Sequence, residues 1–370
     1  MPRSDHALAF VHACAVLPGT TATVDQWRQE ALAEQQADVP GTSTSAMPYR
    51  VLTRWQFDEV GQDASAWCTP EAVQAHVRAG ARFTWEPKAS QAGMAEQAVQ
   101  GLMRHLGEKP QCSLAVYATS SVDENFFQSS LSRVVCGVGL SRVPHFGVAQ
   151  WHGASWIGAM HIIDAYGAES ASQYGAMLIC AEKWPLPTPR VLGWPVVLGD
   201  GAAALWIERL QEPPRQAALA CVDTLVRGFD PYVTLPGAAQ ASLPGIDRQR
   251  VLADARMLMC ELMDQHGLQA HDVQGWLPSG LGLDWDQALQ TSLGMAHLQI
   301  PLAQQSTREH ERDLVDMAWL CAASGPVAIA RLLADIQAGQ VADGTRYLGW
   351  GMSPGGTIGV ALLQARSPSA

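Results

Sequence analysis

The sequence predicts an α/β protein made of two halves of similar content, and three observations support this prediction. Short apolar runs suited to buried strands alternate with segments whose apolar residues recur at helical spacing. Within residues 146–166, an extended run meets a knot of small residues and then a buried helix. After about residue 210 the alternation is repeated more loosely, which indicates an internal duplication.

The first half is predicted to cover residues 1–210. It begins with a strand over 7–18 and a polar helix around 23–38, and the irregular stretch at about 40–84 is interpreted as a cap or insert over the core. The pattern then becomes regular. It predicts helices over 94–106 and 124–140, buried strands over 114–118 and 177–183, and a tight turn at 198–201 that enters a further strand.

The second half is predicted to cover residues 211–370. Its pattern gives strands over 218–226 and 273–278, helices over 249–266 and 285–293, a long apolar helix over 315–337 interrupted at Gly325-Pro326, and a glycine-rich turn before a final strand ending near 363. The two halves therefore alternate strands and helices in a similar way.

Composition narrows the possible partners. The chain has 370 residues, 48% of them hydrophobic and 16% charged, which is typical of a globular protein. The net charge of −11 argues against nucleic acid or an anionic membrane surface as a partner. No apolar run approaches the roughly 18 to 20 residues that span a bilayer. We therefore expect a cytoplasmic protein with no membrane span.

The eight cysteines stand singly, without a Cys-x-x-Cys pair. Most have apolar neighbours, where a free thiol behaves as a small hydrophobic group. The sequence thus predicts neither a disulfide framework nor a zinc site, and we expect no cofactor.

The small residues at 152–155, His-Gly-Ala-Ser, mark the place where chemistry is expected. They let the backbone turn sharply and place one side chain at the positive end of a helix dipole. Many acyl-transfer enzymes keep their nucleophile at such a position.

Several motifs in order resemble condensing enzymes of the thiolase fold, most closely the ketoacyl synthase III group. Ala159-Met160 follows Gly153 by six and seven residues, as an Ala-Leu pair follows the nucleophilic cysteine in that group. The other motifs are Ala118-Thr119-Ser120, Cys180-Ala181-Glu182-Lys183, Leu198-Gly199-Asp200-Gly201-Ala202-Ala203-Ala204 and Gly349-Trp350-Gly351-Met352-Ser353. The resemblance covers about residues 90–365 and implies duplicated thiolase-like halves in a five-layered αβαβα core.

The resemblance also implies where a catalytic triad would lie. In that group a cysteine takes an acyl group as a thioester, and a histidine and an asparagine stabilise an enolate. Alignment of the motifs puts Gly153, Ser279 and Trp319 at these three positions, and a gap would bring His310 near the last. Glycine cannot be acylated, and serine and tryptophan do not replace the paired oxyanion donors. A condensing-enzyme fold without condensing catalysis is therefore expected.

Two other residues are candidates for a different chemistry. Ser155 is a possible replacement nucleophile with His152 as its base, since serine needs an adjacent base at neutral pH. The structural alternatives are a packing serine and a hydrogen-bonded histidine at a helix start. His310 lies in a charged run, which is usually a solvated helix face.

Three functions follow from these observations. The first is a pseudoenzyme that serves as the non-catalytic subunit of a heterodimer with an active ketosynthase, in fatty-acyl or polyketide-type secondary metabolism. The second is an active acyltransferase that moves an acyl group from acyl carrier protein or coenzyme A with Ser155 or a histidine. The third is a homodimeric acyl-thioester binding protein.

Overall fold

The computed structural model describes residues 7–36, 70–107, 111–121, 129–168, 175–184, 190–191, 196–210, 214–232, 246–298 and 318–368. His310, the charged run around it and most of the predicted insert at 40–84 lie outside these ranges. Within them, no helix is long and apolar enough to cross a bilayer.

A mixed β-sheet forms the frame of the described chain. Its strand order is β10-β12-β13-β9-β1-β8-β6-β4-β5. The strands are β1 (Leu8–Val16), β4 (Leu114–Thr119), β5 (His145–Ala149), β6 (Gly175–Glu182), β8 (Gly201–Arg209), β9 (Ala218–Gly228), β10 (Gly275–Leu277), β12 (Arg346–Ser353) and β13 (Thr357–Arg366).

The sheet consists of two leaves that repeat one topology. β1 pairs with β8 along its length but with β9 only from Leu8 to Phe10, so the leaves are joined at one short contact. In each leaf the first strand, β1 or β9, lies beside the last, β8 or β13, and then come β6 or β12 and β4 or β10. The last strand runs antiparallel to its neighbours in both leaves. This repeat confirms the predicted duplication, and the predicted boundary at 210/211 falls between β8 and β9.

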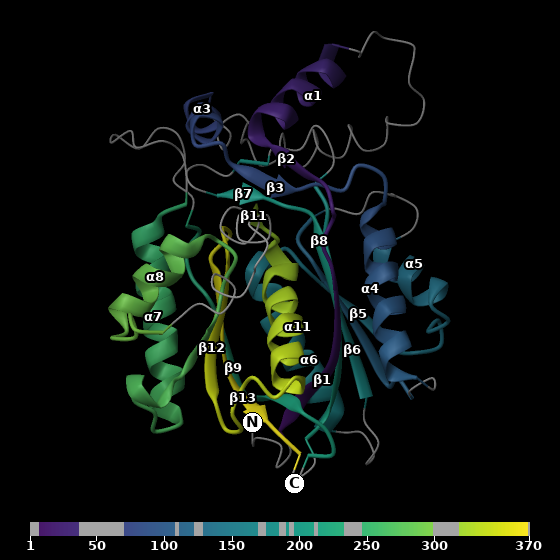
Figure 1. Ribbon diagram of the computed structural model, residues 1–370, viewed down its shortest axis with the longest axis vertical. Helices are drawn as coiled ribbons and strands as arrows, with labels where there is room; N and C mark the ends of the chain where they lie inside the picture. The colour runs from purple at the N-terminus through teal and green to yellow at the C-terminus, as the bar shows by residue number, and fades with distance from the viewer. Residues whose placement is uncertain are drawn as a thin grey trace.

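The helices complete five layers (Figure 1). α6 (Ser155–Ala168) and α11 (Ser324–Gln337) lie between the leaves and contact strands of both. α4 (Gln91–Leu106) and α5 (Ser130–Gly137) cover the outer face of the first leaf, while α7 (Arg248–Gln265) and α8 (Leu283–Ser292) cover the second. The order αβαβα confirms the predicted fold class.

The amino-acid sequence explains which helices are central. α11 buries residues on most of its surface, from Val327 to Ile336, as expected of a helix enclosed by two sheets. α4 instead buries one stripe, including Ala95 and Leu102, and exposes Arg104 to solvent. Only one face of α4 therefore needs a sheet beneath it.

The predicted helix over 315–337 is wrong in its first part. The described chain there forms a short strand, β11 (Ala318–Trp319), and a 3₁₀ turn, η4 (Cys321–Ala323), before α11 begins at Ser324. Pro326 lies in the first turn of α11, where its missing N–H has no helical partner to lose. Gly325-Pro326 thus marks the start of a helix and does not interrupt one.

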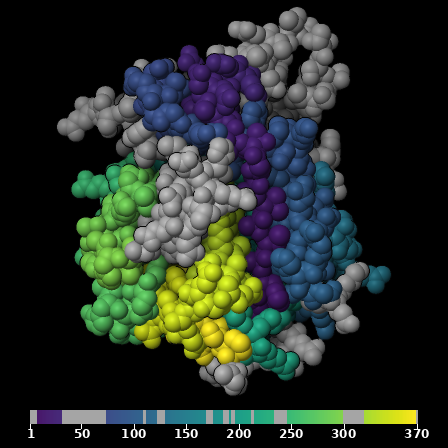
Figure 2. All heavy atoms as spheres, viewed as in Figure 1, coloured from purple at the N-terminus to yellow at the C-terminus, as the bar shows by residue number. Residues whose placement is uncertain are grey.

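A small unit stands above the two leaves (Figures 1 and 2). It consists of β2 (Thr21–Thr23), α1 (Val24–Gln36), α3 (Pro70–Arg78) and β3 (Arg82–Thr84), which we call the cap. The cap has its own apolar cluster, formed by Ala22, Val24, Trp27, Val73, Ala81, Phe83, Val191 and Val197. The last residue belongs to β7 (Val197–Leu198), so this cluster continues into the main body.

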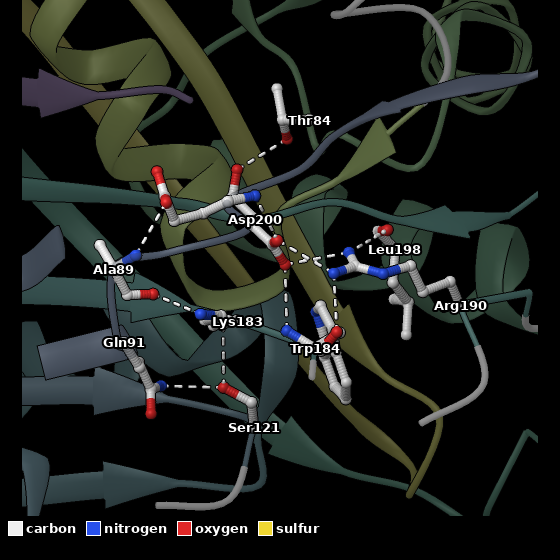
Figure 3. Close-up of polar contacts among 10 residues, drawn as sticks. Thr84, Ala89, Gln91, Ser121, Lys183, Trp184, Arg190, Leu198 and Asp200 are labelled. Atoms are coloured by element: carbon white, nitrogen blue, oxygen red, sulfur yellow. Dashed lines mark hydrogen bonds and ion pairs between the residues drawn. The ribbon is translucent and has the colours of Figure 1, made fainter. Parts of the chain in front are cut away.

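A buried ion pair joins the cap to the main body (Figure 3). Both guanidinium nitrogens of Arg190 donate to the Asp200 carboxylate at 2.9 Å, and both residues are fully buried. Asp200 also accepts the N–H groups of Glu86 and Trp184. Thr84 donates its hydroxyl to the Asp200 carbonyl at 2.6 Å. Asp200, in the Leu198–Ala204 motif, therefore ties a turn and anchors the cap.

Removing one charge of this pair is expected to destabilise the fold strongly. Asp200→Asn leaves the Arg190 guanidinium buried without a counter-charge, which typically costs about 3–5 kcal/mol. The measurement is the free energy of unfolding in urea. The matched control is Glu261→Gln, whose ion pair with Arg227 is solvent-exposed and contributes about 1 kcal/mol or less. Equal losses in the two variants would contradict the anchoring role.

Candidate functional site

The turn between β5 and α6 is held in an unusual backbone conformation. After β5 the chain passes through Gln150, with a φ of 68°, and His152, with a φ of 44°, into the 3₁₀ turn η2 (His152–Ala154). Residues other than glycine seldom adopt positive φ, so surrounding contacts must hold them there. The predicted small-residue elbow therefore exists as a constrained turn.

The second half contains the same turn. Cys321 also has a φ of 44°, and it begins η4, which leads directly into α11. η2 and η4 contact each other between the leaves. In this repeat Cys321 corresponds to His152, and Ala322 corresponds to Gly153. Cys321 is fully buried, and burial raises the pKa of its thiol well above the usual range, so the sulfur is a neutral packing group.

Gly153 is in direct contact with the backbone of β12. A Cβ atom at residue 153 would lie 3.2 Å from the Met352 nitrogen and 3.3 Å from the Gly351 Cα. A Cβ atom at Gly351 would lie only 2.0 Å from the Gly153 carbonyl oxygen. Gly351 therefore requires glycine, and a side chain at residue 153 would be in tight contact with the β12 backbone. The place aligned with the nucleophile has no side chain and little room for one.

His152 is held by two polar atoms and one ring. Its Nδ1 lies 3.0 Å from the Ser353 hydroxyl and 3.2 Å from the Gln150 carbonyl, and its ring stacks on Trp319 with centroids 5.6 Å apart. Because a carbonyl only accepts, we assign the ring proton to Nδ1. Burial lowers the pKa of His152 to about 4, although the Gln150 carbonyl opposes this. The imidazole is thus neutral at pH 7 and a weak base.

Trp319 fills the space beside His152. It belongs to β11, which pairs with β7, and its side chain is 1% exposed. A Cβ atom at Gly280 would lie 3.4 Å from Trp319 Cδ1, so the loop after β10 also reaches this place. We call His152, Gly153, Trp319 and Ser353 the elbow centre. The structure thus brings together two of the three triad-aligned residues, Gly153 and Trp319.

Ser279, the third aligned residue, is bound to another group. Its N–H and hydroxyl donate to the buried Asp286 carboxylate at 3.2 and 3.3 Å. The same carboxylate accepts the indole N–H groups of Trp276 at 3.0 Å and Trp350 at 2.7 Å. Burial raises the pKa of Asp286 to about 6, although these donors lower it. Ser279 therefore serves a structural network that the sequence analysis did not identify.

Ser155 and His152 are not hydrogen-bonded to each other. Ser155 is fully buried, and its hydroxyl has no hydrogen-bond partner among the described residues. The hydroxyl that contacts His152 is that of Ser353, which lies 201 residues further along the chain. Ser353 ends the motif at 349–353, but that motif does not encode a contact with a residue 201 positions away.

A buried carboxylate holds the second elbow as Ser353 holds the first. Glu182 ends β6 and accepts the N–H groups of Ser120, Ser121 and Ala322 at 2.7, 2.8 and 3.1 Å. Burial raises the pKa of Glu182 to about 7, against the effect of these donors. In the repeated topology Glu182 corresponds to Ser353 at the end of β12. Each half thus fixes the other half's elbow with the last residue of a central strand.

Among the described residues, the elbow centre brings Gly153 and Trp319 beside His152, while Ser279 is bound to Asp286. It offers a neutral imidazole, an indole and a hydroxyl that contacts a carbonyl and the Gly355 N–H. In the described part of the chain, no cluster of three or more His, Cys, Asp or Glu side chains could hold a metal ion. This arrangement can pack and hydrogen-bond, but it lacks a side chain at residue 153 that could carry an acyl group.

Substituting Gly153 tests the backbone contact. Gly153→Ala is expected to lower the free energy of unfolding by about 1–3 kcal/mol, because the methyl group would press on backbone atoms that cannot move independently. The control is Gly19→Ala, where a Cβ atom would meet nothing within 4 Å. Urea unfolding at pH 7 measures both. A Gly153→Ala variant as stable as the control would contradict the contact.

The buried Glu182 predicts a characteristic pH dependence. Its pKa is about 7 in the folded protein against an ordinary 4.5, so the native state holds this proton more tightly than the unfolded state. The associated stability is present below pH 4.5 and is lost as the pH rises through about 7. Relative to Glu182→Gln, the wild type should therefore lose on the order of 2 kcal/mol between about pH 5 and pH 8.

Unfolding free energies across this range provide the measurement. His152 titrates in both proteins, so its opposite contribution cancels in the difference. Glu261→Gln, on the exposed surface of α7, is the control and should follow the wild-type profile. If the unfolding free energies of wild type and Glu182→Gln changed with pH in parallel, Glu182 would be ionised over the whole range from about pH 5 to pH 8.

Comparison with known proteins relates this fold to condensing enzymes. No protein-family model matches the sequence, and no curated protein is similar to it. Among solved structures, ChlB3, described as an acyltransferase, has a TM-score of 0.65 and 16% identity over 98% of each chain.

Two further structures give the same result. AbyA1, described as a tetronic acid condensing enzyme, has a TM-score of 0.66 and 15% identity, covering 96% of this chain and 99% of its own. The 3-oxoacyl-(acyl carrier protein) synthase III, FabH, from Pseudomonas aeruginosa PAO1 has a TM-score of 0.62 and 16% identity, covering 98% and 100%. The chain therefore has the thiolase-type fold of the ketoacyl synthase III-like condensing enzymes.

Proposed function

We propose that this protein is a catalytically silent subunit that pairs with an active ketosynthase in the synthesis of fatty-acyl or polyketide-type metabolites. The observation that supports this most is the closed elbow centre. Gly153, which the motif alignment puts at the nucleophile position, touches the β12 backbone, and the Trp319 ring lies against His152. A protein that keeps the fold but fills its centre fits a role in assembly better than one in turnover.

The edge of the first leaf provides a surface for such a partner. β5 is the last strand at its end of the sheet, so one side of its backbone has no strand partner in the described chain. Phe146 and Trp151, on and just after β5, are 46% and 39% exposed. Exposed aromatic groups beside an unpaired strand edge fit a second chain that extends the sheet and covers both rings.

An acyltransferase that uses Ser155 has less support from the geometry. Its hydroxyl is buried and contacts no base among the described residues. His152, the expected base, has a pKa of about 4 and directs Nδ1 to Ser353 and Gln150. An acyl-thioester binding protein remains the third hypothesis, in which the chain holds the thioester without transferring it.

The net charge of the chain indicates which subunit of such a pair binds the acyl carrier protein. A net charge of −11 gives no broad basic surface for an acidic carrier protein, so we assign carrier docking to the partner subunit. We also place the pair in the cytoplasm, where acyl thioesters are made and used.

The test is co-expression with a ketosynthase of this fold that keeps an intact Cys-His-Asn set. Light scattering after size exclusion gives the assembly, and release of carbon dioxide from a malonyl thioester gives the activity. A mixed dimer whose activity depends on the partner's cysteine, and survives Ser155→Ala here, is the expected result. A homodimer that turns over acyl thioester alone and loses activity on Ser155→Ala would overturn the proposal.

A matched pair of surface variants tests the docking edge. Phe146→Asp places a charge on β5 and should abolish the mixed dimer. Met257→Asp changes a similarly exposed hydrophobic residue, 44% exposed, on α7 at the outer face of the other leaf. It should leave the assembly intact. Equal effects of the two variants would show that β5 is not the docking edge.

A further inference from the structure

The position of Trp319 depends on a very short piece of sheet. β11 has two residues and pairs in parallel with the two residues of β7, placing Trp319 opposite Leu198. One more hydrogen bond, from the Gly199 N–H to the Trp319 carbonyl at 3.1 Å, continues the ladder. So short a ladder is marginal by itself. The contacts that fix β7 therefore help to place the Trp319 ring that lies on His152.

β7 is fixed from the cap side. Val197 packs into the cap cluster with Phe83 and Val191. The Leu198 N–H donates to the Arg190 carbonyl at 2.7 Å, and the Arg190 guanidinium donates back to the Leu198 carbonyl at 3.2 Å. The same guanidinium lies 4.7 Å from the centre of the Phe83 ring. The backbone and the side chain of Arg190 thus hydrogen-bond to β7, and its guanidinium group packs on Phe83 of the cap.

Asp200 completes the connection from the other end of β7. Its carboxylate holds the Arg190 fork and the Glu86 N–H, and its N–H donates to the Thr84 carbonyl at 2.9 Å (Figure 3). β3 also contacts both β7 and β11. An unbroken series of contacts therefore runs from β3 through Arg190 and Asp200 to β7, β11 and the Trp319 ring.

We propose that the cap holds the elbow centre closed, with Arg190 as the residue that positions Trp319 against His152. This inference rests on the proposed silent role, since it explains what keeps the centre filled, but it concerns the isolated chain and not its partner. Weakening the contacts between Arg190 and β7 should let the Trp319 ring move away from His152. The Asp286 network on β10 and β12 should stay unchanged. Trp319 would then respond to the substitution while Trp350, in the Asp286 network, would not.

The experiment is fluorine NMR of the full chain labelled with 5-fluorotryptophan, in which each of the 13 tryptophans gives one resonance. Trp319→Phe and Trp350→Phe assign the two resonances needed. The test variants are Arg190→Lys, which keeps the charge but loses the fork, and Phe83→Leu, which removes the ring under the guanidinium. Phe83→Leu serves if Arg190→Lys does not fold.

In the variants the Trp319 resonance should move and gain a solvent isotope shift in D₂O, while the Trp350 resonance stays in place. The pKa of His152, followed by proton–carbon NMR, should rise from about 4 toward its ordinary 6.5 as the ring loses its cover. A purely structural role for Arg190 would move both tryptophans together or neither. An unchanged Trp319 resonance and an unchanged His152 titration in a folded variant would overturn the proposal.

The Arg227→Lys variant is the control for a general effect of changing an ion pair, because Arg227 and Glu261 are exposed on β9 and α7. It should leave both resonances and the titration unchanged. Failure of this coupling would leave the proposed subunit role intact, since assembly and decarboxylation are measured on the mixed dimer. Failure of the mixed dimer would likewise leave the coupling measurable.

Discussion

Two backbones meet without side chains between them where Gly153 of η2 faces Gly351 of β12, and the geometry of the centre follows from this contact. It brings the first elbow to the end of a strand from the other half. Ser353 can then reach the His152 ring, which is held at a positive φ. A larger residue at either glycine would separate the two elements, so the contact is a condition for the other interactions of the centre.

Because of the internal repeat, each half contributes a residue that holds the elbow of the other half, but these two residues differ chemically. Glu182 supplies a carboxylate to the backbone amide of Ala322, whereas Ser353 supplies a neutral hydroxyl near His152. The amide donors favour the ionised form of Glu182, but burial outweighs them and raises its pKa to about 7, so this group holds its proton more tightly than a carboxyl in water. At the first elbow the stacked indole of Trp319 has the corresponding closing role. Both elbows are thus closed by the protein's own groups, through different physical interactions.

The fold was predictable from the sequence because burial and turn chemistry leave local patterns. The alternation of strands and helices and the Leu198–Ala204 motif located most elements, and the small residues at 152–155 located the elbow. Near Gly325-Pro326 the pattern misled, because a proline in a first helical turn looks like one that breaks a helix. The contacts of the candidate site were harder to predict from the sequence. Asp286 gathers Trp276, Ser279 and Trp350 from three separate segments, and no local spacing encodes that convergence.

The three residues that the motif alignment puts at the triad positions are all held by contacts that also stabilise the fold. A thiol at residue 153 would still face the β12 backbone, with Trp319 stacked on His152 and Ser279 bound to Asp286. Ser279 and Trp319, the other two residues that the motifs align with the triad, carry neither an imidazole nor an amide. These groups also belong to networks that hold β7, β10 and β12 in place. The closed centre is therefore part of the packing that stabilises this fold.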